Sequence, residues 1–399
     1  MKVLYVVQRY GDDVAGGAEE HCRQFATRLA DRGHDIEVVT TQARSYVDWA
    51  NHYPGGTTEI DGVTVHRLGV AMERDVARFG ALDARITSRG YTPAWLEREW
   101  MRLQGPYVPE LPSWLEREAG RFDIVSFVTY LYFTTWAGLP AVASRVPTVL
   151  HPTAHDEAYL YLRLFDRMFA LPSGFAFLTP EEEALVRRRF RTRAPGVVVG
   201  VGQDLDDALS IAGPPDPSAF RAAFGLDDRP YLLYLGRFDS AKGADELLAY
   251  FVALKERQPG PLALVIVGQA VVEPPPHPDI VVTGYVEEAM KQHAVAGATA
   301  LVQPSYFESF SIVLLEAWAH RTPVLVQGRC DVLAGQARRS GGGLPYEGFA
   351  EFEAAVEMLC SDESLRRRLG EAGREYAAVA YRWEAVIERY ERFLAEIAA

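Results

Sequence analysis

The sequence predicts an α/β fold in which doubly wound sheets form in both halves of the chain. Short apolar runs alternate with segments of helical period along most of the 399 residues. A strand at Val3–Val7, a glycine-bearing loop, a helix at Ala18–Arg32 and a strand at Ile36–Thr40 open the first half. The same alternation restarts at Tyr231–Leu235, after the proline-rich stretch IAGPPDP. Hydrophobic residues make up 48% of the chain and charged residues 24%, which is ordinary for a globular protein with real cores.

Composition excludes several classes of function. The formal net charge of −13 argues against nucleic acid as a partner. Cys22, Cys330 and Cys360 are far apart and odd in number, which favours reduced, mostly structural thiols. The apolar part of the N-terminus is too short for a signal peptide, and no apolar run reaches 18 residues. We expect a cytoplasmic protein, and peripheral contact with the inner face of a membrane remains open.

The loops after the first-half strands carry candidate site residues. Gly16 and Gly17 let the backbone approach a ligand closely, although a plain βα turn has the same pattern. The strand Asp123–Phe127 leads into TYLYFTT, which contains Tyr130, and Pro147–Leu150 opens on HPTAHDE. Two histidines and an acidic pair at the carboxyl end of a strand are placed to face a cleft. Core or surface histidines are the alternative.

Two further features of the first half have competing interpretations. Aromatic residues are dense around Ala71–Gly120 and include Trp49, Trp100 and Trp114; they either stack on a sugar or lipid or pack an irregular insertion. Five arginines in residues 187–193 either dock on an anionic membrane or form the solvated end of a helix. A helix is expected over Phe165–Leu171, and Thr179 with Glu182 forms a capping box for the helix that follows.

The second half carries the stronger signals for binding an anion. Arg237 and Lys242 flank the turn GRFDSAKG after a predicted strand, where a guanidinium fork and an ammonium together neutralise a diphosphate. Strands at Leu262–Val267 and Ile280–Thr283 end at Gly268 and Gly284. Loops at two such strand ends suit a nucleotide base.

The stretch YFESFSIVLLEAW, Tyr306–Trp318, predicts a strand-to-helix turn with a glutamate on each side. Ser309 or Ser311 is expected to cap the helix, and the free N–H groups near Ser311, Ile312 and Val313 suit a phosphate. Glu316 lies five residues beyond Ser311, roughly 7.5 Å along the axis, at a distance that suits ribose hydroxyls. An ordinary capped helix with two solvated glutamates is the alternative.

The spacing of Glu308 and Glu316 resembles the E-x7-E signature of retaining GT-B glycosyltransferases of family 4. The arrangement of Arg237 and Lys242 matches that family's pyrophosphate site, and the GGAE loop resembles its N-terminal loop. Ser311 departs from the pattern because glycine is frequent there. The resemblance implies two Rossmann-like domains facing across a cleft: an acceptor-side domain at 1–202, joined by the C-terminal helix 381–399, and a donor-binding domain at 203–380.

The resemblance also implies roles for individual residues. The catalytic set is His155, Arg237, Lys242 and Glu308, with His151 as the alternative histidine by offset. The donor-binding set is Gly16, Gly17, Gly236, Gly268, Tyr285, Val286, Phe310, Ser311, Ile312, Val313 and Glu316. The acceptor-side set is Glu19, His151, Asp156 and Tyr130.

The expected reaction is retaining transfer of a glycosyl unit from a UDP-, GDP-, ADP- or dTDP-sugar to a hydroxyl of a sugar, glycolipid or small metabolite. Neither a tightly bound cofactor nor a metal is expected, and the DxD-like group Asp204, Asp206 and Asp207 is discounted because it falls in an interdomain loop. The alternatives are a nucleotide-sugar epimerase, a sugar phosphorylase and a non-catalytic nucleotide-sugar-binding protein.

Overall fold

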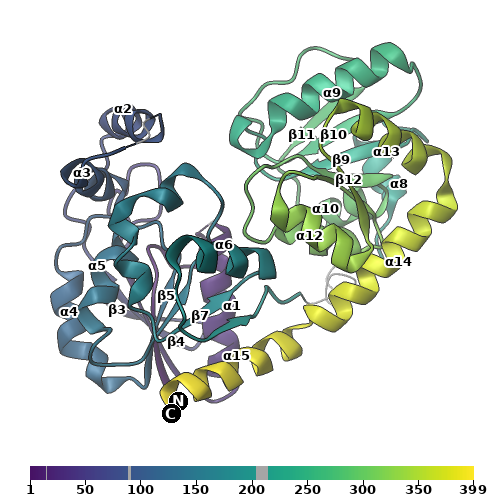
Figure 1. The fold of residues 1–399 in the computed structure, drawn as a ribbon. Helices are drawn as coiled ribbons and strands as arrows, with labels where there is room; N and C mark the ends of the chain where they lie inside the picture. Colours follow the sequence, from purple (N-terminus) through teal and green to yellow (C-terminus); the bar gives the residue numbers. More distant parts are fainter. Residues whose placement is uncertain (15, 89–90, 204–213) are drawn as a thin grey trace. The chain divides into compact units, whose positions relative to one another are not determined.

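The computed structural model describes residues 1–14, 16–88, 91–203 and 214–399 (Figure 1). The chain divides into two compact units. Unit 1 comprises Met1–Gly200 with Ile387–Ala399, and unit 2 comprises Val201–Val386. Each unit is an α/β domain, so the doubly wound architecture expected from the sequence is confirmed.

Unit 1 contains an eight-stranded sheet in the order β3-β4-β2-β1-β5-β6-β7-β8. Its strands are β1 (Lys2–Val6), β2 (Asp35–Thr41), β3 (Gly56–Ile60), β4 (Val63–Leu68), β5 (Ile124–Val128), β6 (Thr148–His151), β7 (Gly174–Phe177) and β8 (Gly196–Val198). All neighbours run parallel except β3, which pairs antiparallel with β4 at the sheet edge. β3 could not be expected from the sequence, because GTTEI is exposed and polar, without an apolar run.

The helices of unit 1 cover both faces of this sheet (Figure 1). They are α1 (Gly17–Asp31), α2 (Val76–Thr87), α3 (Ala94–Gln104), α4 (Leu111–Glu118), α5 (Phe133–Val142) and α6 (Pro180–Phe190). Four short 3-10 helices are η1 (Ala119–Arg121), η2 (Ala158–Tyr161), η3 (Arg163–Phe165) and η4 (Met168–Ala170). The continuous helix expected over Phe165–Leu171 is therefore wrong. Two separate 3-10 turns, η3 and η4, replace it, and Phe165 and Met168 are both buried.

The aromatic-rich insertion mainly contributes to the core of unit 1. Trp49 and Trp100 are fully buried, and their indole N–H groups donate to Gln104 O (2.7 Å) and Asp83 Oδ1 (2.8 Å). Trp114 is half-buried against the same core. The packing interpretation therefore holds for these three side chains.

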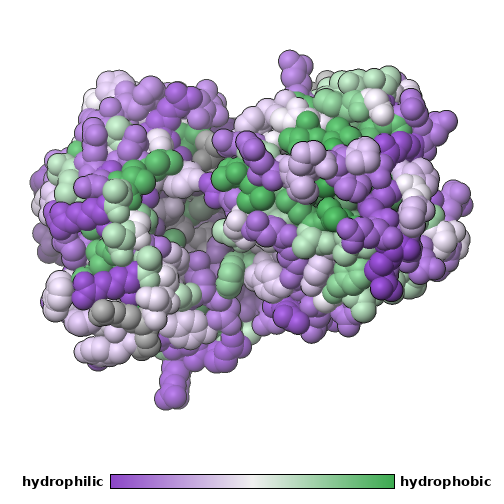
Figure 2. Space-filling model, turned by 90° about the horizontal axis from the view of Figure 1, so that it is seen from above, coloured by the Kyte–Doolittle hydropathy of each residue, from purple (hydrophilic) through white to green (hydrophobic). Residues whose placement is uncertain are grey.

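The arginine cluster at the end of α6 is largely neutralised by carboxylates. Arg187 pairs with Glu183 at 2.8 Å, and Arg189 pairs with Asp166 at 2.7 Å. These pairs favour the solvated helix end over a membrane-docking patch. Hydrophilic residues predominate on the face in Figure 2, with apolar residues in separate patches. Among the described residues, no helix combines the length and the apolar character needed to cross a bilayer.

Unit 2 contains a six-stranded parallel sheet in the order β11-β10-β9-β12-β13-β14. Its strands are β9 (Tyr231–Leu235), β10 (Ala263–Val267), β11 (Ile280–Gly284), β12 (Ala300–Gln303), β13 (Val324–Gln327) and β14 (Gly343–Tyr346). β9, β10, β12 and β13 are buried along their whole length, which is why they appear in the sequence as continuous apolar runs.

The helices of unit 2 complete its two layers on either side of the sheet. They are η5 (Ser240–Lys242), α8 (Pro217–Ala223), α9 (Ala244–Arg257), α10 (Glu288–Ala296), α11 (Ile312–Ala319), α12 (Asp331–Ser340), α13 (Phe349–Ser361) and α14 (Glu363–Ala380). The last helix, α15 (Trp383–Ala398), buries Val386, Tyr390 and Phe393 along one side, as its amphipathic pattern predicts. Tyr390 packs in unit 1, where its hydroxyl lies 3.1 Å from Ser126 Oγ.

Candidate active site

The loops after β9 and β12 bring two of the predicted catalytic residues together. The Lys242 ammonium lies 2.7 Å from Oε1 of Glu308, although the two residues are 66 positions apart. Gln303, at the end of β12, donates to the same Glu308 oxygen at 3.5 Å and to Ser311 Oγ at 3.1 Å. Lys242, Glu308 and the start of α11 therefore belong to one connected polar group.

Asp239 positions the cations of this loop, and the sequence analysis did not single it out. Its side chain is almost fully buried, and Oδ2 lies 2.5 Å from Nε of Arg237. Oδ1 accepts the backbone N–H of Lys242 at 3.0 Å and so caps η5. The aspartate therefore orients the half-exposed Arg237 guanidinium and fixes the turn that carries Lys242. The signal in the sequence was an Asx-type cap, three residues before the lysine.

Glycines allow the loops at this sheet edge to touch one another. Gly243 has φ 79°, and a Cβ there would lie 2.3 Å from Pro304 O. Gly268 has φ 122°, and a Cβ there would lie 2.2 Å from Gly236 O. Any other residue at these positions would push apart the backbones of the β9, β10 and β12 loops.

The start of α11 differs in one respect from the sequence prediction. Ser311 occupies the cap position, but its side chain makes no cap hydrogen bond to the helix. The reason is conformational: Ser311 has φ 71°, and its hydroxyl accepts from Gln303. The Ser311 side chain therefore gives the first-turn amides no acceptor, and the N–H groups of Ile312 and Val313 at this helix end suit an anion.

Glu316 is held by a lysine that the sequence analysis missed. Lys291 Nζ lies 2.8 Å from Glu316 Oε1 and 2.9 Å from Glu288 Oε2. Burial lowers the pKa of Lys291, but the two carboxylates outweigh that effect and raise it above its usual value. The three residues border a small cavity of ≈ 40 Å³. The i,i+3 spacing of Glu288 and Lys291 was the available signal, but only the fold brings Glu316 to them.

The remaining donor-binding candidates differ in exposure. Tyr285 is 83% exposed just after β11, whereas Phe310 is buried with its ring 5.1 Å from that of Tyr381. Phe310 therefore has only backbone to offer a ligand, and its carbonyl already accepts from Gln336.

In unit 1, the Gly16–Gly17 loop packs around a buried ion pair. Glu19 Oε1 lies 2.6 Å from Arg9 NH2 and accepts from Gln8 Nε2 at 2.8 Å. A Cβ at Gly16 would lie 2.1 Å from the other Glu19 oxygen. Glu19 is 6% exposed, and its bonds to Arg9 and Gln8 hold the loop in place. Its place on the acceptor side stays a prediction. Glycine at position 16 leaves room for that carboxylate.

The two candidate histidines lie in different environments. His151 is fully buried: Nδ1 lies 3.0 Å from His21 Nε2, and Nε2 lies 2.8 Å from the Tyr390 hydroxyl. Burial lowers the pKa of His21 to about 3 and that of His151 well below its ordinary value. Both rings are neutral, and both nitrogens of His151 already contact protein groups. The acceptor contact expected of His151 stays a prediction.

His155 is the histidine that stays accessible, and it lies beside a carboxylate. Nδ1 of His155 lies 3.7 Å from Glu157 Oε1, which also accepts from the Tyr130 hydroxyl at 3.3 Å. The Tyr130 side chain is only 1% exposed, and its effect on the site is to hold the Glu157 carboxylate through this hydrogen bond. Asp156 is half exposed and accepts from the Tyr161 hydroxyl at 2.6 Å. Glu157, which was not singled out, is the centre of this group.

The described residues contain no group of three or more His, Cys, Asp or Glu side chains able to hold a metal ion. Asp204, Asp206 and Asp207 lie outside the described residues.

Comparison with known proteins places the chain in a family. Residues 15–207 match the family model described as Glycosyltransferase Family 4, and residues 218–376 match Glycosyl transferases group 1. A D-inositol 3-phosphate glycosyltransferase of Frankia alni is 31% identical over 418 residues, covering 95% of this chain and 94% of the relative. The chain therefore belongs to the glycosyltransferases of family 4, and it is an enzyme of that class.

Other relatives agree with this assignment. A D-inositol 3-phosphate glycosyltransferase of Kribbella flavida is 26% identical, covering 94% of this chain and 89% of the relative. Among solved structures, the sucrose-phosphate synthase of Thermosynechococcus elongatus has a TM-score of 0.72 at 18% identity, covering 99% of this chain and 98% of that one. The Anabaena protein Alr3699/HepE, solved with UDP-glucose, has a TM-score of 0.69 at 14% identity, covering 99% and 100%. These likenesses support the GT-B fold.

Proposed function

We propose that this glycosyltransferase transfers a glycosyl unit from a nucleotide sugar to an acceptor hydroxyl with retention of anomeric configuration. The observation that carries the proposal is the group formed by Lys242, Glu308, Gln303 and Ser311 at the start of α11. It combines a cation, a carboxylate and the N-terminal end of a helix, which suits a diphosphate attached to a sugar.

The proposed roles follow from charge. Arg237, Lys242 and the first amides of α11 stabilise the negative charge that develops on the leaving diphosphate. Glu308, held by Lys242, orients the donor sugar, and Glu316 accepts hydroxyl hydrogen bonds from the ribose. Tyr285 and Val286 lie in the loop assigned to the base. Nucleotide sugars bound to solved proteins of this fold, such as UDP-glucose in the Anabaena protein, support the donor class.

The proposed reaction needs no protein nucleophile, because each bond that breaks is matched by one that forms. The bond between the anomeric carbon and the diphosphate oxygen breaks, and a bond from the acceptor oxygen to the same carbon forms on the same face. The acceptor proton passes to the departing diphosphate oxygen. The reaction needs no metal in this scheme, because the two cations and the helix amides supply the positive charge.

We assign the acceptor to unit 1, with His155 and Glu157 as the polar groups that meet its hydroxyl. Glu157 accepts from Tyr130, and His155 lies beside it, so a hydroxyl between them has both a donor and an acceptor. The relatives named D-inositol 3-phosphate glycosyltransferases support a polyhydroxylated ring as the acceptor.

The test begins with a thermal-shift screen against UDP-, GDP-, ADP- and dTDP-sugars, followed by mass spectrometry of acceptors with the best donor. Arg237→Ala is then compared with Arg257→Ala, an exposed arginine of the same unit that pairs with Glu353. Turnover should fall by orders of magnitude in Arg237→Ala and stay unchanged in Arg257→Ala, with both proteins folded. Equal turnover in the two variants would remove Arg237 from the mechanism, and donor consumption without acceptor would indicate epimerisation or hydrolysis.

A further inference from the structure

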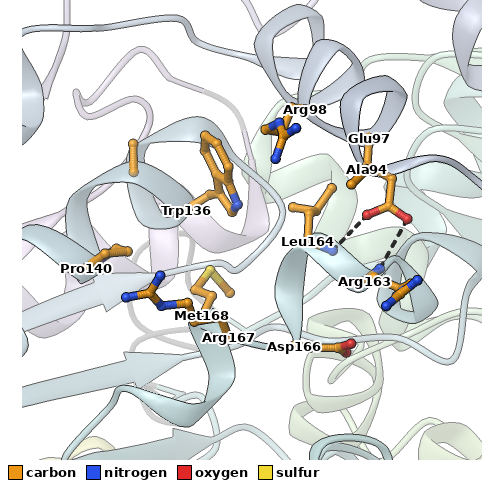
Figure 3. A pocket seen from close by; sticks show the side chains of 11 residues that line it. Ala94, Glu97, Arg98, Trp136, Pro140, Arg163, Leu164, Asp166, Arg167 and Met168 are labelled. Carbon is orange, nitrogen blue, oxygen red and sulfur yellow. Dashed lines mark hydrogen bonds between the residues drawn. The ribbon is translucent and has the colours of Figure 1, made fainter.

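Unit 1 contains a pocket that none of the proposed donor or acceptor residues lines. It lies between α3, α5, η3 and η4 (Figure 3). Its volume is ≈ 650 Å³, which is the size of a small-molecule site.

The pocket combines an aromatic wall with guanidinium groups. Trp136 is half-buried on α5, and Leu164 and Met168 add apolar surface from η3 and η4. Figure 3 shows Arg98 and Arg167 on two sides of Trp136, with Arg163 farther from it. An indole surface between two guanidinium groups fits a ring that carries a negatively charged substituent.

The positive charge of this pocket is only partly neutralised from within. Among the described residues, Arg98, Arg163 and Arg167 form no ion pair with a carboxylate. The two acids of the pocket have other partners than these guanidinium groups. Asp166 pairs with Arg189 at 2.7 Å, and the buried Glu97 accepts backbone N–H groups of Arg163 (3.3 Å) and Leu164 (2.8 Å). These three exposed arginines outnumber the carboxylates of the pocket, so the pocket is net positive in a chain of net charge −13 and favours an anionic ligand.

We propose that this pocket is an accessory site for a sugar ring that bears a phosphate or carboxylate group. Arg98 and Arg167 bind the anionic group as guanidinium forks, and the ring packs against Trp136. The choice of a sugar rests on the proposed function, since the enzyme handles glycosyl groups. The anionic character of the ligand rests on the arginines alone.

The segment that lines the pocket also supports the proposed acceptor site. Leu164 and Met168 border the pocket, whereas the neighbouring Phe165 and Phe169 pack on the Tyr130 ring, with centroids 4.8 and 5.7 Å apart. Tyr130 in turn donates to Glu157. A ligand that fixes η3 and η4 therefore also fixes the group that positions Glu157.

Calorimetry on the full chain tests the proposal with glucose 6-phosphate and glucuronate as probes and glucose as the neutral comparison. The charged sugars should bind at least tenfold more tightly than glucose. The double variant Arg98→Gln/Arg167→Gln should lose at least tenfold in affinity for them, and Trp136→Leu should weaken both probes. Arg85→Gln/Arg193→Gln, two exposed arginines of unit 1 outside the pocket, is the matched control and should bind as the wild type does.

Two further measurements on the same samples separate the possible failures. Binding of the best nucleoside diphosphate reports on the donor site and should be equal in all variants; its absence throughout would count against the proposed function and leave the pocket result intact. Unchanged affinity of glucose 6-phosphate in the Arg98/Arg167 variant overturns the accessory site. Cosedimentation with phosphatidylglycerol vesicles that depends on these arginines, without sugar binding, also overturns it and identifies a lipid surface as the partner.

Discussion

Lys242 and Glu308 form an ion pair of 2.7 Å between the loop after β9 and the loop after β12. The carboxylate is largely buried and the ammonium is partly exposed, so the pair points its cation outward. The backbone N–H of Lys242 donates to Asp239, and this hydrogen bond fixes the turn that carries the lysine. In the proposed mechanism the ammonium meets the diphosphate and the carboxylate meets the donor sugar.

Replacing Lys242 by methionine should reduce kcat by about a hundredfold or more, because the charge that develops on the leaving group loses its counterion. Lys242→Arg should retain part of the activity, since the charge remains while its position changes. Steady-state kinetics with a saturating nucleotide sugar measure both effects. Lys2→Met, an exposed lysine, serves as the control. Equal kcat in Lys242→Met and wild type would contradict the proposed role.

Changing Ser311 tests the strained backbone at the start of α11. At φ 71° a non-glycine residue costs roughly 1 kcal/mol or more. Ser311→Gly should therefore raise stability or leave it unchanged, because relief of strain offsets the lost hydrogen bond from Gln303. Ser311→Ala should be the least stable of the three, since it keeps the strain and loses the bond. Urea denaturation ranks them, and an alanine variant as stable as the glycine one would refute the strain argument.

Removing Lys291 should weaken donor binding more than the chemical step. Without its ammonium, Glu316 loses the partner that fixes one carboxylate oxygen, so the other is less well placed for the ribose. In Lys291→Met we expect KM for the donor to rise about tenfold, or about 1.4 kcal/mol, with kcat nearly unchanged. Glu288→Gln, which removes the other partner of the lysine, is the control and should leave KM close to wild type. A drop in kcat alone would argue against ribose binding by Glu316.

Stability should fall as the pH is lowered through the ordinary histidine pKa. His21 and His151 stay neutral when folded, since burial lowers both pKa values, whereas both protonate near pH 6.5 in the unfolded chain. The unfolded state then binds more protons, so their full contribution is present above pH 6.5 and is lost below it. At pH 5.5 each histidine should cost roughly 1.4 kcal/mol.

Denaturant titrations between pH 7.5 and 5 check this dependence. His21→Phe, whose ring can pack on Phe25 as the imidazole does, should show a shallower loss of stability below pH 6.5. An identical pH slope in wild type and variant would rule out the buried histidine pair as a source.

Gly243 should be irreplaceable in the Lys242 loop. A methyl group there would meet Pro304 O at 2.3 Å, and the residue has φ 79°. Gly243→Ala should destabilise unit 2 by about 1–3 kcal/mol and reduce activity with it. Gly260→Ala, where a Cβ meets nothing within 4 Å, is the matched control. Thermal unfolding that shows both variants equally stable would contradict the close approach of these loops.

Much of the fold could be predicted because it depends on local pattern. The buried strands of unit 2 are continuous apolar runs, and β9 begins and ends where the sequence indicates, at Tyr231 and Leu235. The exposed β3 and the broken helix at Arg163–Ala170 could not be predicted, because pairing at a sheet edge and burial of Phe165 and Met168 decide them.

The sequence by itself determined the α/β class, the family and the presence of Arg237 and Lys242 in one loop. These features depend on spacing within short segments. Only the tertiary structure decided which partners these side chains have. It brought Lys242 to Glu308 and Lys291 to Glu316, buried His151 against Tyr390, and left His155 beside Glu157. The first three of these pairs are far apart in the chain and meet only through strand order and helix packing, which no local pattern records.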